Sequence, residues 1–173
     1  MVRAGANVKA ANRYGVTPLS LACTNGNGAM VELLLKAGAD PNTTLPGGET
    51  ALMTAARTGK IEAVRVLVSR GADVNAKESR QGQTALMWAA AEGHVATVEA
   101  LIQAGADFHA RLDSGFTPLL FAVREGRIGM VRALLKAGAD VNESLQPSAD
   151  APRRIGYPRR SRGGASEIGR AHV

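Results

Sequence analysis

The chain has 173 residues, 45% of them apolar, which is enough for one ordinary domain or a short repeat array with a buried core. Its net charge of +6 is unevenly placed: residues 1–145 hold 15 Lys and Arg against 13 Asp and Glu, and residues 146–173 hold 6 Arg against 2 acidic residues. A nearly neutral body makes nucleic-acid binding unlikely, one cysteine excludes an internal disulfide, and the apolar runs are too short to predict a membrane span.

The predicted elements repeat with a period of 33 or 34 residues. A Gly-Ala pair recurs at spacings of 33, 33, 34 and 33 residues, beginning at Gly5, Gly38, Gly71, Gly105 and Gly138. Each full unit begins with a threonine two residues before a leucine, and a glycine follows nine residues after that threonine. This period predicts a repeat protein in which each unit packs on its neighbours.

Each full unit predicts two helices and a loop. The first helix is expected between the threonine and the glycine, over residues 17–26, 50–59, 84–93 and 117–126. Threonine caps a helix start, Pro18 and Pro118 suit its first position, and glycine suits its end. A second helix follows, indicated in the third unit by the spacing of Val95, Val98 and Leu101. Turn signals such as PGG at 46–48 then predict a hairpin-like loop.

Three recurring strings carry a resemblance to a known family. GVTPLSLACTNG at 15–26, GFTPLLFAVREG at 115–126 and LLKAGAD at 34–40 and 134–140 resemble the ankyrin repeat, and the likeness covers about residues 5–145. It implies an all-α solenoid of stacked antiparallel helix pairs with loops projecting at right angles, used in most of the family to bind proteins. The family's usual histidine after Thr-Pro-Leu is absent, and we expect added apolar packing in its place, at Ser20, Met53, Met87 and Leu120.

The two ends depart from the period. Residues 1–4 match the last turn of a second helix, so the native N-terminus is expected to be missing, and the fifth unit stops after residue 145. We therefore predict ankyrin repeats over 1–145, with four full units and partial units at both ends, and a disordered basic tail over 146–173. The final EIGRAHV resembles a translated sequencing adapter, which predicts that part of the tail is not native; a genuine basic arm is the alternative.

The sequence predicts no catalytic, cofactor or metal site. Cys23 shares its register with alanines and is expected to be a small core residue, and three scattered histidines offer no site. His94 is expected to have a structural role, and His109 a role in a turn. The aspartates that follow Gly-Ala recur with the repeat and are expected to form turns. The compartment stays open, with the cytoplasm as the default expectation.

The candidate binding residues are those that differ between units. Counting from each threonine, positions 2, 5, 6 and 9 form the predicted core face of the first helix, whereas positions 4, 7 and 8 point away from it. The resemblance places positions 4, 7 and 8 on a concave groove, and Trp88 is the predicted central contact. The candidates, including the loop tips, are Arg13, Tyr14, Leu21, Asn25, Glu49, Arg57, Arg80, Gln81, Trp88, Glu92, Asp113, Phe116, Phe121, Arg124 and Glu125.

These observations predict a non-catalytic module that binds a protein partner of unknown identity, with no small-molecule substrate. The richness in Ala, Gly and Arg favours a piece of a longer bacterial protein. The alternative is a regulatory or spacer segment of a larger enzyme or transporter. A third hypothesis, nucleic-acid binding through the basic tail, is the weakest because the body itself carries little net charge.

Overall fold

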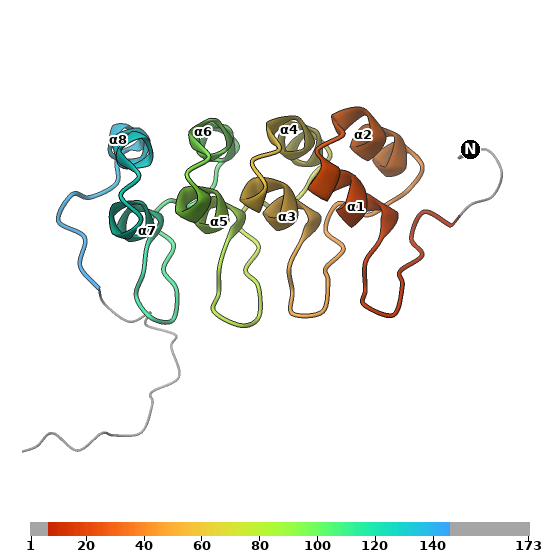
Figure 1. Ribbon diagram of the computed structural model, residues 1–173, viewed down its shortest axis with the longest axis horizontal. Coiled ribbons are helices and arrows are strands. Elements are labelled where there is room, and N and C mark those ends of the chain that lie inside the picture. Colours follow the sequence, from red (N-terminus) through yellow and green to blue (C-terminus); the bar gives the residue numbers. More distant parts are fainter. Residues whose placement is uncertain (1–6, 146–173) are drawn as a thin grey trace, which may run out of the picture.

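The computed structural model describes residues 7–145, which contain eight α-helices. Their bounds are α1 Pro18–Asn25, α2 Gly28–Lys36, α3 Ala51–Arg57, α4 Ile61–Ser69, α5 Ala85–Glu92, α6 Val95–Gln103, α7 Pro118–Arg124 and α8 Ile128–Ala137. The helices form four pairs in one row (Figure 1). The first helices of the pairs, called here the inner helices, lie side by side, and the second helices form the outer row. The loops project from the inner side, away from the outer helices (Figure 1).

The inner helices begin where the threonines predict. Thr17, Thr50, Thr84 and Thr117 each accept a hydrogen bond from the backbone N–H three residues later, and this satisfies a donor that the helix leaves free. Ser20, one of the residues that replace the family's histidine, closes a capping box because its Oγ accepts from the Thr17 N–H at 3.0 Å. Met53 and Met87 are at most 1% exposed, so at these two positions the expected apolar packing is present.

The core lies between the two helix rows and between successive pairs. Leu52, Leu86, Leu67 and Leu101 are all 0% exposed, and small alanines on the inner helices let neighbouring pairs approach closely. The predicted core positions of the first helix are buried in every unit, with Val123 as the exception because no unit follows it among the described residues.

Polar contacts join successive units at their loop ends. The Asn42 amide donates to the Gly71 carbonyl at 3.1 Å, and its oxygen accepts from the Asp73 N–H at 2.8 Å. Asn75 makes the same pair of hydrogen bonds one unit later. The recurring aspartates form the expected turns; Asp73, for example, accepts from the N–H two residues on at 2.9 Å.

Charged and aromatic side chains add further contacts between units. His94 has the predicted structural role, since its Nε2 lies 3.0 Å from the Arg57 carbonyl oxygen of the preceding unit. On the outer row, the guanidinium of Arg70 in α4 hydrogen-bonds the carboxylate of Glu32 in α2. This contact, together with Lys36, lowers the pKa of Glu32 to about 2.

The structure confirms the predicted all-α solenoid of stacked helix pairs, and the loops have the expected hairpin-like form. In the fourth loop, for example, the Leu112 N–H donates to the Phe116 carbonyl at 2.9 Å. Residues 1–6 and the predicted tail at 146–173 lie outside the described residues.

We predict that the Cys23 thiol does not react with Ellman's reagent in the folded protein. The side chain is 0% exposed, and burial raises the pKa of its thiol to about 12, so both access and the thiolate are lacking. Absorbance should show one reactive thiol only after urea is added. Complete labelling of the native protein at the rate of a free thiol would mean that this part of the first unit is open.

Candidate functional site

The candidate residues occupy one side of the stack, although their exposure differs. The exposed ones lie at the loop tips and at the ends of the inner helices: Arg13, Tyr14, Leu21, Asn25, Arg80, Gln81, Glu92, Asp113, Arg124 and Glu125. The half-buried ones are Glu49, Arg57, Trp88 and Phe116, and Phe121 is buried. We call the exposed and half-buried set the loop-side surface.

The prediction that position 4 of the inner helix faces the open groove is wrong for two units. Thr54 and Phe121 at this position are 4% and 5% exposed, whereas Leu21 in the first unit is 56% exposed. Since burial appears only where a unit precedes, position 4 packs towards the preceding unit. Phe121 lies in a small cluster with Met87 of that unit and the Phe116 ring, at 5.2 Å between ring centroids.

Trp88 is intermediate between the core and the surface. Its ring packs against the main core while remaining partly exposed, and the Arg57 guanidinium lies 5.6 Å from the ring centroid. The indole N–H is buried and makes no hydrogen bond within the described residues. An unpaired buried donor is costly, so this position is less favourable than an ordinary core site. Trp88 thus has a packing role that the sequence reasoning did not assign to it.

Arginines stacked on aromatic rings recur across the loop-side surface. Arg124 covers both rings of the fourth unit, at 5.1 Å from the Phe116 centroid and 4.9 Å from that of Phe121. Arg13 lies 4.7 Å from the Tyr14 ring at the first loop tip. A stacked guanidinium is attracted by the ring while its edge can still donate hydrogen bonds. These contacts hold three arginines in defined positions on the surface.

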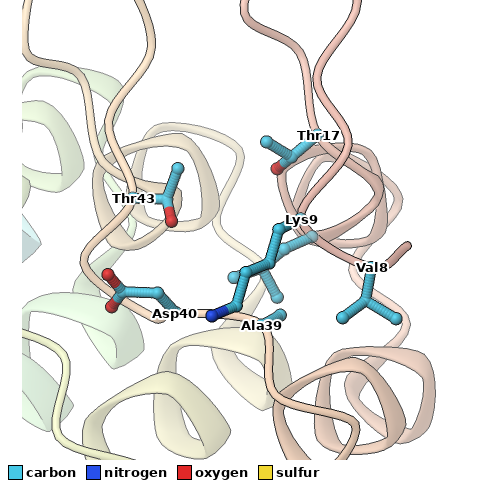
Figure 2. A pocket seen from close by; sticks show the side chains of 7 residues that line it. Val8, Lys9, Thr17, Ala39, Asp40 and Thr43 are labelled. Carbon is cyan, nitrogen blue, oxygen red and sulfur yellow. The ribbon is translucent and has the colours of Figure 1, made fainter.

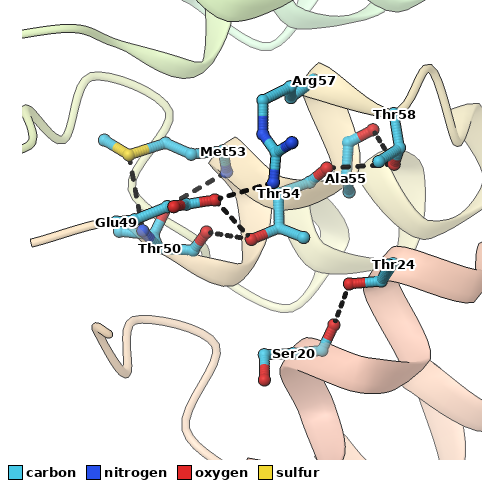
Figure 3. A network of polar contacts seen from close by, with 9 residues as sticks. All are labelled: Ser20, Thr24, Glu49, Thr50, Met53, Thr54, Ala55, Arg57 and Thr58. Atoms are coloured by element: carbon cyan, nitrogen blue, oxygen red, sulfur yellow. Dashed lines mark hydrogen bonds and ion pairs between the residues drawn. The ribbon is translucent and has the colours of Figure 1, made fainter. Parts of the chain in front are cut away.

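Glu49 organises the polar part of the second unit. Its Oε1 accepts from the Thr54 hydroxyl at 2.9 Å and lies 3.5 Å from Arg57 Nη2. Figure 3 shows the Glu49 carboxylate between these two side chains, on the side of α3 that faces the loop. Because Arg57 also stacks on Trp88, the network links a loop residue of the second unit to the inner helix of the third.

Glu78 is a site-forming residue that the sequence reasoning missed. It lies in the loop before α5, is 7% exposed, and accepts from the backbone N–H groups of Arg80, Gln81 and Gln83 at 2.6, 2.7 and 3.1 Å. Burial alone would raise the pKa of Glu78, but these three hydrogen bonds outweigh it and the pKa is lowered. The available signal was the single spacing of 34 residues, which places one extra residue in this loop.

The described residues offer little for other kinds of chemistry. No group of three or more His, Cys, Asp or Glu side chains within residues 7–145 could hold a metal ion. No helix within that range is long and apolar enough to cross a membrane. A shallow hollow lies at the N-terminal end of the row, distant from most of the loop-side surface, and is described below.

Comparison with curated proteins finds two short matches. The chain is 56% identical over 41 residues to the Ankyrin repeat and LEM domain-containing protein 1 homolog of Caenorhabditis elegans, and 50% identical over 44 residues to Ankyrin repeat and SOCS box protein 16 of Mus musculus. These matches cover 24% and 25% of the chain but only 6% and 10% of the two relatives. Both relatives are animal proteins, so the matches lend no support to the expected bacterial source.

The family comparison covers almost all of the described residues. The model for "Ankyrin repeats (3 copies)" matches three overlapping segments, residues 1–78, 41–112 and 77–144. Ankyrin repeats are generally modules of protein–protein interaction and are typically non-catalytic. The period, the capped helix pairs and these matches agree, and the chain belongs to the ankyrin-repeat family.

Proposed function

We propose that the protein is a non-catalytic module that binds a protein partner through the loop-side surface. The observation that carries this proposal is the division between repeated and varied residues. The repeated threonines, leucines and asparagines cap helices, fill the core and join units, so they serve the architecture. The side chains that differ from unit to unit, such as Arg80, Gln81 and Glu92, are exposed on the loop side.

The surface chemistry supports a protein partner. Its charged side chains are of both signs, with Arg80 and Arg124 against Glu92 and Asp113, so it lacks the single-sign field that phosphate backbones attract. Exposed Tyr14 and the arginine-covered rings add aromatic and arginine groups, which are enriched where proteins bind one another.

A second proposal is that the repeats are a regulatory or spacer segment beside other domains. The printed names of both relatives join ankyrin repeats to a further element, a LEM domain in one and a SOCS box in the other, and the matched segment is at most 10% of either protein. This role is compatible with partner binding, because a docking segment can position a neighbouring domain.

Binders selected from a displayed random-peptide library on the immobilised chain should map to the loop-side surface. We expect the double variant Arg80→Ala/Glu92→Ala to weaken the selected peptides by about 2 kcal/mol, roughly 30-fold, if these residues lie at the centre of the contact. Fluorescence polarisation gives the dissociation constants. The matched control is Glu99→Ala/Gln103→Ala, which changes exposed residues of the outer helix α6. Peptides that lose affinity only for the control variant would overturn the proposal.

A further inference from the structure

The first unit presents an apolar face that later units bury. Met30 of α2 is 46% exposed, whereas the residues at its position in the following units, Ala63, Thr97 and Met130, are at most 1% exposed. Leu21 of α1 shows the same contrast with Thr54 and Phe121. Both positions therefore pack against a preceding unit wherever one exists. We call Leu21 and Met30 the entry face.

The fourth unit presents the complementary face. Val123 of α7 is 57% exposed, whereas Cys23, Ala56 and Ala90 at its position are all 0% exposed. This position therefore packs against a following unit. Ile128 and Leu135 of α8 are exposed at 73% and 38%, and the equivalents of Leu135 in the earlier units pack against the core. We call Val123, Ile128 and Leu135 the exit face.

We propose that the exit face of one chain docks on the entry face of a second copy, so that the two copies stack as successive units do within one chain. The support is continuity with the contacts between units, since each face consists of positions that three internal junctions already bury against each other. Exposed apolar patches on soluble proteins mark interaction sites. The contact is heterologous, so each bound copy still offers one free face and longer stacks can form.

A polar bond supports the same register. Asn42 and Asn75 bridge to the next unit, but Lys9 occupies this position before the first unit, and a lysine ammonium has no acceptor to offer. At the other end, Asn142 occupies it after the fourth unit, and its side-chain amide makes no hydrogen bond within residues 7–145. In the stack, this amide lies where it can donate to the Gly38 carbonyl and accept from the Asp40 N–H of the second copy.

A hollow marks the place where the stack must form this contact. Figure 2 shows it between the loop that follows α2, the start of α1 and the segment that precedes α1. Its lining residues are Val8, Lys9, Thr17, Leu19, Ala39, Asp40 and Thr43. Residues 7–9 match residues 140–142 in the repeat, so the two segments compete for one place. Residues 7–9 have to move aside, which costs the partial burial of Val8 and gains the bonds of Asn142.

The experiment is sedimentation velocity of the full chain over a concentration series, with two variants that each block one face. Met30→Glu places a charge on the entry face, and Val123→Glu places the same charge on the exit face. Both replace partly exposed side chains, and circular dichroism checks that they fold. Gln103→Glu is the matched control, since it adds the same charge to the last turn of a helix in the middle of the stack.

We expect the average mass of the natural chain and of Gln103→Glu to rise with concentration. Each blocked variant alone should remain a monomer, and an equimolar mixture of the two should form a dimer, because one intact face of each remains. Asn142→Ala should weaken association of the natural chain without changing its thermal midpoint. A monomeric natural chain, a monomeric mixture, or a single blocked variant that dimerises alone would overturn the proposal; the last result would indicate pairing of like faces.

Discussion

Leu101→Ala is expected to lower the free energy of unfolding by about 2 to 5 kcal/mol, the range for removing a buried leucine that leaves a cavity. Leu101 lies in α6, is 0% exposed, and belongs to the core that joins the two helix rows. Since each unit packs mainly on its neighbours, a cavity in the third unit weakens the junctions on both sides. Urea unfolding followed by circular dichroism at 222 nm measures the loss.

Leu33→Ala is the matched control for this variant. Leu33 is 50% exposed, and the third and fourth units already carry Ala100 and Ala133 at the same position, so the shorter side chain is compatible with the fold. We expect a loss well below that of Leu101→Ala. If the two variants lost the same amount, or if Leu101→Ala lost less than about 1 kcal/mol, the assignment of Leu101 to a packed core would be wrong.

The features that repeat could be predicted from the sequence because each appears several times and each has a local physical cause. A threonine that caps a helix, a glycine with positive φ after it and a leucine two residues inside act through the neighbouring backbone alone. The aspartate turns are equally local. Consequently, Thr17 and Gly26 bound α1 as expected, and the helix pairs follow from the same reasoning in the other units.

Position 4 of the inner helix was misjudged because its environment is not local. A helical wheel separates one core face from one solvent face, but an inner helix here has neighbours on three sides: its own outer helix and the inner helices of both adjacent units. Phe121 is buried and Trp88 half-buried for this reason. Only positions 7 and 8, with Asn25, Glu92 and Arg124 among their occupants, remain on the exposed side.

The third loop is the other feature that the repeat pattern could not supply. A single occurrence has no second copy to compare with, and the extra residue in the period does not reveal which side chain closes the longer loop. Glu78 does so through hydrogen bonds with the backbone, whose geometry depends on the turn itself. The Ser79 N–H also donates to the Gly47 carbonyl of the second loop at 2.8 Å, so this loop is linked to its neighbour.

Glu78→Ala is expected to lower the free energy of unfolding by about 2 to 3 kcal/mol, because it removes charged hydrogen bonds and leaves backbone donors without their acceptor. The loop tip that carries Arg80 and Gln81 should lose its fixed conformation, so hydrogen exchange of their amides should become faster. Urea unfolding and exchange measured by NMR test the two effects. Glu99→Ala is the control, since Glu99 is exposed on α6 and its carboxylate has no hydrogen-bond partner among the described residues.

The stabilising effect of Glu78 should also depend on pH, in a direction that follows from its lowered pKa. A carboxyl group with a lower pKa in the folded state stabilises the fold at neutral pH, and this contribution disappears as the pH falls through the folded-state pKa. The stability difference between the natural chain and Glu78→Gln should therefore be largest near neutral pH and shrink in acid. Glu99→Gln should show a difference that hardly changes over the same range. A Glu78→Gln difference that stayed constant into acid would mean that the loop does not hold the ionised carboxylate.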